Sequence, residues 1–171
     1  MLIKGRALRL KIDDNINTDY IISGRYKFRI QDPGELGNHI FEDIDPQFAS
    51  KVKEGDIIVA GKNFGMGSSR EQAPLALKSA GISLIIAQSF ARIFYRNAFN
   101  VGLPLLQCET TGIKDLDYLE VNLKSGDIKD ITSGIEKKAE PIPDFIAGIL
   151  EAGGIIEYLK KYGRLNLDEK T

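Results

Sequence analysis

The middle of the chain alternates short apolar runs with amphipathic segments. The apolar runs, at 56–60, 83–87 and 103–107, are continuous and short, which is typical of strands buried on both faces of a parallel sheet. Between them, 73–80 and 90–100 carry helical patterns. This order of strand, loop, helix, strand, helix and strand predicts an α/β fold with parallel strand pairing.

The second amphipathic segment, FARIFYRNAFN, predicts a helix that Ser89 can cap and Gly102 closes. Its predicted apolar stripe consists of Phe90, Ile93, Phe94 and Ala98.

The flanking segments predict a different architecture. Alternation within residues 3–12 predicts a half-buried strand at the N-terminus. Residues 118–123 and 128–132 alternate around the turn Ser125-Gly126-Asp127, which predicts an additional antiparallel meander. The remaining predicted elements are short helical turns within 32–52, two helices at 143–152 and 155–162 split by two glycines, and a frayed polar tail at 164–171.

Length and composition narrow the functional classes. The 171 residues suit one domain, and a net charge of −1 provides no general attraction for nucleic acid. The sequence has no apolar run that approaches a membrane span and no signal-peptide pattern at its start. A single cysteine, Cys108, excludes an intrachain disulfide and fits a reducing compartment, so we expect a cytoplasmic protein.

The same counts limit the chemistry that this chain can perform alone. One cysteine cannot supply a cysteine-ligated zinc or iron–sulfur site. One histidine, His39, argues against a histidine-based metal site or a Ser-His-Asp triad, and its polar surroundings predict a surface or helix residue. Acid–base work must therefore fall to other groups or to another chain.

The stretch 61–74, GKNFGMGSSREQAP, holds the strongest candidate chemistry. A glycine-rich loop between a strand and a helix presents backbone N–H groups and a helix N-terminus to an anion. Ser68, Ser69 and Arg70 add hydroxyls and a guanidinium that matches a carboxylate. Two interpretations stay open on this pattern alone: a site for an anionic small molecule, or a tight turn with a serine cap.

The start of the following helix determines whether the side chains of Ser68, Ser69 and Arg70 are free to bind a ligand. Ser68 with Glu71, or Ser69 with Gln72, could form a capping box, but Pro74 is best placed in a first helical turn. We therefore expect the helix to start near Glu71, which leaves the two serines and Arg70 in the loop. A helix dipole contributes about 0.3–2 kcal/mol, which lowers the pKa of a hydroxyl by about one unit. An alkoxide would need a stronger electrostatic partner.

A second candidate segment follows Gly24. Arg25, Lys27 and Arg29 alternate with Tyr26 and Phe28. The pattern fits an anion-recognising loop, or a solvated strand face with two aromatic rings packed inward.

Several segments together resemble a known family. GKNFGMGSSREQAPLALKSAGISLIIAQSFARIFYRNAFNVGLPLL at 61–106, DDNINTDYIISGRY at 13–26 and ILEAGGIIEYLKKYG at 149–163 are similar to the small subunits of 3-isopropylmalate dehydratase. More broadly they resemble the swivelling β/β/α domain at the C-terminus of the aconitase superfamily. The resemblance covers nearly the whole chain and implies that fold, with the parallel unit at its centre.

The resemblance implies a hydro-lyase of leucine biosynthesis that converts 2-isopropylmalate to 3-isopropylmalate by dehydration and rehydration. By motif position, Ser68 would accept the α-proton as an alkoxide, and Ser69 and Arg70 would bind substrate carboxylate. Arg70 would also stabilise the alkoxide, and Asp19 matches the acidic residue of the entry motif near the site.

The family also implies a partner. Its large subunit carries a [4Fe–4S] cluster that acts as a Lewis acid, so this chain would bind no cofactor and no metal itself. Activity would require the large subunit, although the isolated chain could form a homo-oligomer.

The loop at 26–29 leaves the substrate open. In this family the loop discriminates between substrates, and Lys27 and Arg29 resemble the aconitase loop more than the aliphatic isopropylmalate loop. An inward Arg29 would favour a third carboxylate, as in a homoaconitase or another tricarboxylate enzyme. The alternative from another class is a non-catalytic anion-binding module.

Overall fold

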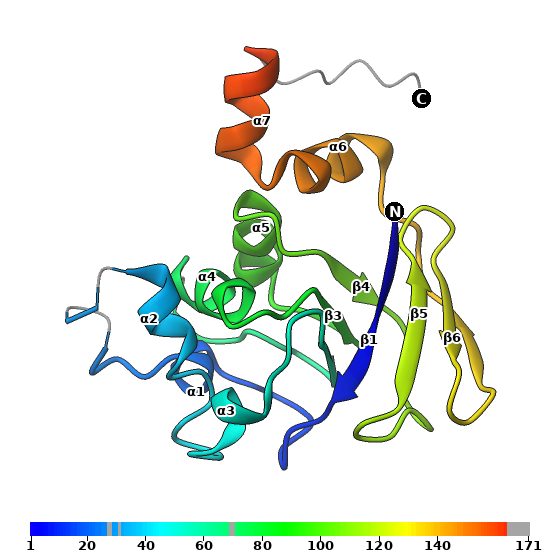
Figure 1. Cartoon of the computed structure of the whole chain (residues 1–171), viewed down its shortest axis with the longest axis horizontal. Helices are drawn as coiled ribbons and strands as arrows, with labels where there is room; N and C mark the ends of the chain where they lie inside the picture. The colour runs from blue at the N-terminus through cyan, green and yellow to red at the C-terminus, as the bar shows by residue number, and fades with distance from the viewer. Residues whose placement is uncertain (27–28, 31, 69–70, 164–171) are drawn as a thin grey trace.

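The computed structural model describes residues 1–26, 29–30, 32–68 and 71–163, whose strands form one mixed sheet in the order β4-β3-β2-β1-β5-β6-β7 (Figure 1). The predicted frayed tail at 164–171 lies outside this described part. The strands are β1 (Leu2–Leu8), β2 (Ile57–Ala60), β3 (Leu84–Ala87), β4 (Leu105–Gln107), β5 (Tyr118–Asn122), β6 (Asp127–Asp130) and β7 (Glu136–Lys138). The helices are α1 (Thr18–Ile21), α2 (Pro33–Gly37), α3 (Phe48–Lys51), α4 (Gln72–Ser79), α5 (Arg92–Asn100), α6 (Asp144–Ala152) and α7 (Ile155–Tyr162).

One half of the sheet is parallel, as the alternating pattern predicts. β2 pairs with β3 from Ile57↔Leu84 to Ala60↔Ala87, and β3 pairs with β4 in the same direction. Every residue of β2 and β3 is buried, which explains why both read as continuous apolar runs. The helices α4 and α5 provide the crossovers between these strands, so the predicted β–α–β–α–β unit is confirmed.

β1 joins the two halves of the sheet. Its end pairs in parallel with β2 at Ala7↔Ile57, and its length pairs antiparallel with β5 from Leu2↔Asn122. The predicted meander is confirmed in β5 and β6, and β7 adds a short charged edge strand that the sequence pattern did not predict.

The predicted N-terminal strand at 3–12 is too long at its C-terminal end. β1 stops at Leu8, because the Arg9 N–H donates to Asp115 Oδ1 at 2.9 Å and not to a neighbouring strand.

Two predictions about α5 are wrong. Ser89 does not cap the helix, since α5 begins at Arg92 and the Ser89 hydroxyl accepts a hydrogen bond from the Asn63 N–H at 2.8 Å. Ile93 is not on the buried stripe, because the helix packs through Phe94, Ala98 and Phe99 and leaves Ile93 51% exposed.

The last two helices follow the prediction closely. α6 begins at Asp144, just after Pro143, and Gly153 and Gly154 separate it from α7 with φ values of 93° and 133°. Figure 1 shows α6 and α7 at the α5 end of the molecule. None of the helices in the described ranges has the length and apolar character needed to cross a bilayer.

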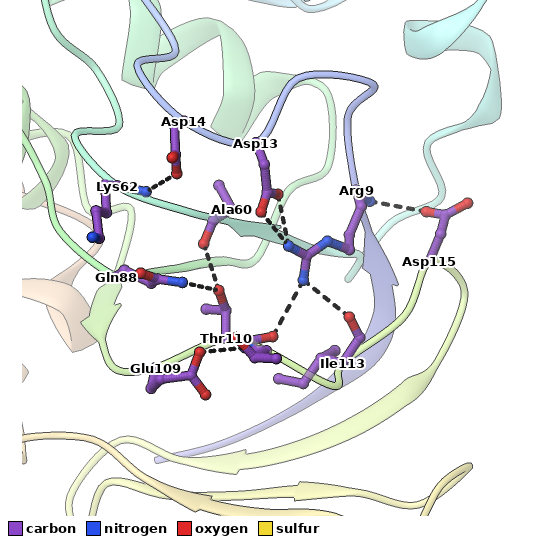
Figure 2. Close-up of polar contacts among 11 residues, drawn as sticks. Arg9, Asp13, Asp14, Ala60, Lys62, Gln88, Glu109, Thr110, Ile113 and Asp115 are labelled. Carbon is purple, nitrogen blue, oxygen red and sulfur yellow. Dashed lines mark hydrogen bonds and ion pairs between the residues drawn. The ribbon is translucent and has the colours of Figure 1, made fainter.

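An arginine ties together the loops at the carboxyl edge of the parallel strands (Figure 2). One Arg9 nitrogen donates to the carbonyls of Ile113 and Thr110 at 2.9 and 3.3 Å. The other nitrogen contacts both carboxylate oxygens of Asp13 at 2.6 and 2.7 Å. Because Nη2 contacts Asp13 while Nη1 binds the two carbonyls, the guanidinium fixes the start of the segment that follows β1 relative to the loop after β4.

Thr110 continues the same network into the interior. Its side chain is fully buried, and Oγ1 donates to the carbonyl of Ala60, the last residue of β2, at 2.9 Å (Figure 2). The loop after β4 is therefore held against the end of β2, where the glycine-rich loop begins.

We predict that Thr110→Val lowers the free energy of unfolding by about 1–3 kcal/mol, because the buried Ala60 carbonyl loses a hydrogen bond from a side chain of similar shape. Urea denaturation measures the change. The neighbouring Thr111 is exposed, so Thr111→Val is the matched control and should change stability little. Equal destabilisation by both variants would contradict a structural role for the Thr110 hydroxyl.

Candidate functional site

Two segments that leave the sheet at the same edge pair through their main chains. The segment after β1 and the glycine-rich loop after β2 form a short parallel bridge between Asn17 and Met66. The Gly65 N–H donates to the Ile16 carbonyl at 2.8 Å, and the Thr18 N–H donates to the Met66 carbonyl at 2.9 Å. The loop is therefore fixed by backbone bonds up to the residue before Gly67.

A buried threonine then fixes Ser68 itself. Thr18 is 2% exposed, and its Oγ1 donates to the Ser68 carbonyl at 3.0 Å. The Ser68 side chain is exposed, and its hydroxyl makes no hydrogen bond within the described part of the chain. The main chain of this predicted catalytic residue is thus held in place while its Oγ faces the surface.

Asp19 lies at the same corner. It occupies the first turn of α1, where the N-cap Asn17 accepts its N–H at 2.9 Å. Because Asp19 directly follows Thr18, the structure brings the Thr18-Asp19 dipeptide against Ser68, as the motif resemblance implies.

A close aromatic contact determines the shape of the loop. Gly65 has φ of +79°, and a Cβ at this position would lie 2.2 Å from Cγ of Phe94 in α5. The Phe94 ring in turn meets Phe64 edge to face, with 5.2 Å between centroids. Only glycine meets both the backbone and the space requirement here.

Ser68 borders a cavity of about 300 Å³ between the glycine-rich loop, α1 and the start of α5, a volume at the lower end of ligand pockets. The cavity is lined by Thr18, Gly65, Gly67, Ser68, Ala91, Arg92, Ile93 and Phe94. Sequence reasoning did not assign the last four residues to the site. A signal was present, because these residues follow β3, whose carboxyl end lies beside that of β2 in a parallel sheet.

The start of α4 agrees with the prediction drawn from Pro74. The helix begins at Gln72, Glu71 precedes it without a side-chain cap, and Pro74 lies in the first turn. Ser68 therefore stays in the loop as expected. Three other predicted site residues, Ser69, Arg70 and Lys27, lie outside the described residues.

The segment after Gly24 forms turns, so the predicted strand face is wrong where the structure describes it. Tyr26 stacks on His39 with 4.0 Å between ring centroids. Its hydroxyl donates to Glu42 at 2.7 Å, and His39 Nδ1 lies 2.8 Å from the same carboxylate oxygen. The hydrogen bond from Tyr26, followed by that from His39, lowers the pKa of Glu42.

This cluster anchors one end of the basic loop. Arg25 pairs with Asp43, so its charge is compensated. Arg29 has an exposed side chain, and its N–H donates to the Tyr26 carbonyl at 3.1 Å. Of the described basic residues in the loop, Arg29 is thus the one whose side chain remains available to bind a ligand or another subunit.

The described residues offer no ligand set for a metal. They contain no group of three or more His, Cys, Asp or Glu side chains arranged to hold an ion. Cys108 is half-buried, and burial raises its pKa to about 11, so it is a neutral thiol near pH 7 and a poor nucleophile.

Comparison with known proteins places this fold in a class. A family model described as the aconitase C-terminal domain matches residues 14–110, which include both loops of the site. The crystal structure of a 3-isopropylmalate dehydratase from Methanocaldococcus jannaschii has a TM-score of 0.89 and 50% identity, covering 95% of this chain and 96% of that one.

Curated relatives are similar over nearly their full lengths. A 3-isopropylmalate dehydratase small subunit from Halothermothrix orenii is 57% identical, covering 94% of this chain and 96% of the relative. The isopropylmalate/citramalate isomerase small subunit of Methanocaldococcus jannaschii is 54% identical, covering 94% and 95%. The chain belongs to the family of 3-isopropylmalate dehydratase small subunits, and the predicted fold class is confirmed.

We predict that Gly65→Ala lowers the free energy of unfolding by about 1–3 kcal/mol more than Gly134→Ala does, because only the first variant overpacks. Gly134 is a matched control: its φ is +77°, and an added Cβ meets nothing within 4 Å. Urea denaturation of both variants separates the clash with Phe94 from the backbone cost that they share. If both variants lost the same free energy of unfolding, the Phe94 ring would be able to move away from the added methyl group without an energetic cost.

Proposed function

We propose that this chain is the small subunit of a hydro-lyase that isomerises 2-isopropylmalate to 3-isopropylmalate by removing and re-adding water, a step of leucine biosynthesis. The observation that carries the proposal is the position of Ser68. Its hydroxyl is exposed beside a ligand-sized cavity, while the buried Thr18 holds its carbonyl. The names of near full-length relatives support the same activity.

The proposed chemistry assigns each predicted residue a task. Ser68 Oγ, as an alkoxide, accepts the α-proton while the substrate hydroxyl leaves the neighbouring carbon as water, with the second proton supplied by an acid outside this chain, which gives an alkene. Water then adds with the opposite regiochemistry, and Ser68 returns the proton. The external acid recovers its proton from the water that adds back. Ser69 and Arg70 bind carboxylate, and Asp19 lies next to the Thr18 that fixes Ser68.

Ionising the Ser68 hydroxyl requires more electrostatic stabilisation than the N-terminus of α4 provides. A helix N-terminus contributes at most about 2 kcal/mol, too little to ionise a serine at neutral pH. Arg70, two residues after Ser68, is the positive charge nearest to it in the sequence. The rest must come from outside the chain, which makes Ser68 half of a composite site.

The partner in this proposal is a large subunit that carries the [4Fe–4S] cluster. The described residues contain no group of three or more side chains that could hold such a cluster, and the sequence has a single cysteine. When bound to the large subunit, the cluster would supply Lewis acidity to the substrate hydroxyl. A reducing compartment such as the cytoplasm suits both the cluster and the unpaired Cys108.

The relatives do not favour the other candidate functions. Their names refer to isopropylmalate or citramalate, neither of which is a tricarboxylate. They also name enzyme subunits and not a binding module. Lys27 and Arg29 are then proposed to contact a carboxylate of a dicarboxylic substrate.

We predict that Ser68→Ala lowers kcat of the reconstituted two-subunit complex by about 10²–10⁴-fold, the range expected for loss of a general base. Size-exclusion chromatography should show unchanged assembly. Ser79→Ala, at an exposed serine in α4, is the control and should leave kcat unchanged. Substantial activity in the Ser68 variant would remove Ser68 from the role of base.

We predict that Arg29→Leu shifts the preference of the complex toward substrates with a larger apolar γ-substituent, because the carboxylate contact that is lost is common to both substrates whereas the new leucine favours the larger apolar group. The measurement is the ratio of kcat/KM for 2-isopropylmalate to kcat/KM for citramalate. An unchanged ratio would show that Arg29 faces solvent in the complex.

A further inference from the structure

The cavity beside Ser68 has a wall that the proposed chemistry does not yet use. Besides the glycine-rich loop and Thr18, it is lined by four consecutive residues, 91–94, at the start of α5. Phe94 is 2% exposed and packs into the core against Gly65. Arg92 and Ile93 therefore provide the two large exposed side chains on this wall.

Ile93 presents an aliphatic side chain to the cavity. A single exposed aliphatic residue is common on protein surfaces and indicates little by itself. What distinguishes Ile93 is that it is 51% exposed while lining the same cavity as the predicted base. α5 already buries Phe94, Ala98 and Phe99, so Ile93 is not needed on the face that packs against the core.

Arg92 presents an uncompensated charge next to it. Its guanidinium is exposed and makes no ion pair or hydrogen bond with any residue that the structure describes. Arg6 pairs with Asp56, Arg9 with Asp13 and Arg25 with Asp43. The guanidinium groups of Arg29 and Arg96 also lack a partner among the described residues, but Arg92 is the arginine that lines the Ser68 cavity. An unpaired guanidinium beside an aliphatic group is complementary to a ligand that carries a carboxylate next to an apolar substituent.

The basic side chains of the loop after Gly24 do not offer a contact for an apolar substituent, so this wall of the cavity could provide it. That loop offers Lys27 and Arg29, whose charges suit a carboxylate and not an isopropyl group. If the substrate has an apolar γ-substituent, another part of this chain or the partner must contact it. Among the described residues that line the Ser68 cavity, Ile93 is the large exposed aliphatic one.

We infer that the first turn of α5 determines substrate specificity: Ile93 contacts the apolar γ-substituent of the 2-hydroxy diacid, and Arg92 contacts one of its carboxylates. This inference rests on the proposed function and extends it to two residues outside the glycine-rich loop. The two neighbouring side chains have separate effects. Ile93 discriminates between diacids by the size of the apolar group, whereas Arg92 binds all of them alike.

The test uses the complex of this chain with its large subunit and measures kcat/KM for 2-isopropylmalate and for citramalate, whose substituent is a methyl group. Ile93→Ala should lower kcat/KM for 2-isopropylmalate about tenfold and for citramalate less than about threefold, because the larger group loses more contact. Arg92→Gln should lower both values by a similar factor of about ten or more, mainly through KM, because both diacids lose a charge-assisted bond.

Ile131→Ala is the matched control, since Ile131 is 54% exposed and follows β6 in the meander. It should leave both values unchanged. Equal losses on the two substrates for Ile93→Ala, or failure of that variant to assemble with the large subunit, would overturn the inference and make Ile93 a general or interface residue. Inactivity of the wild-type complex on both diacids would instead contradict the proposed function itself.

Discussion

The site depends on main-chain hydrogen bonds between the segment that follows β1 and the loop that follows β2. Backbone groups of Ile16 and Thr18 bind those of Gly65 and Met66, so the course of the loop is fixed whatever side chains it carries. The two segments approach so closely that a Cβ on Gly67 would lie 2.5 Å from the Asn17 side chain. This contact places Ser68 within reach of the Thr18 hydroxyl and beside the start of α5.

In this arrangement, the residues that hold the loops in place differ from the residues proposed to act on the substrate. The supporting groups are buried or bonded to the main chain, as Thr18 and Thr110 show. The groups proposed to act on the substrate, Ser68, Asp19 and Arg92, are exposed at one corner of the carboxyl edge of the parallel strands. Such a division suits a surface that is completed by another subunit, because the exposed groups are already positioned before the partner arrives.

The sequence correctly predicted those helices and strands whose position depends only on residues close by in the chain. Continuous apolar runs identified β2 and β3, and Pro74 located the start of α4 within one residue. Predictions failed where a distant group decides the outcome. Ser89 is a plausible helix cap in the sequence, but its hydroxyl accepts a hydrogen bond from the Asn63 N–H, 26 residues away. β7 lacks apolar alternation because its residues, Glu136–Lys138, form an edge.

The same reasoning applies to the site. Ser68 was predictable because the glycines, serines and arginine that mark it are contiguous. The wall formed by Arg92 and Ile93 was not, since helical periodicity placed Ile93 among the buried residues. Which side of α5 faces the core is decided by the fit of Phe94 over Gly65, a contact between residues 29 positions apart. Periodicity gives the spacing of apolar residues but not which of them the neighbouring loop can cover.

The central position of β1 has a consequence for the order of folding. β1 leaves the ribosome before the other described strands and takes its long antiparallel pairing with β5, from Leu2↔Asn122, so residues up to 122 must be made before the sheet can close. Until then β1 has an unpaired edge, which is prone to wrong pairing with other chains. The loops of the candidate site start at β1 and β2, whose parallel pairing does not need β5, so the risk of wrong pairing lies on the other edge of β1.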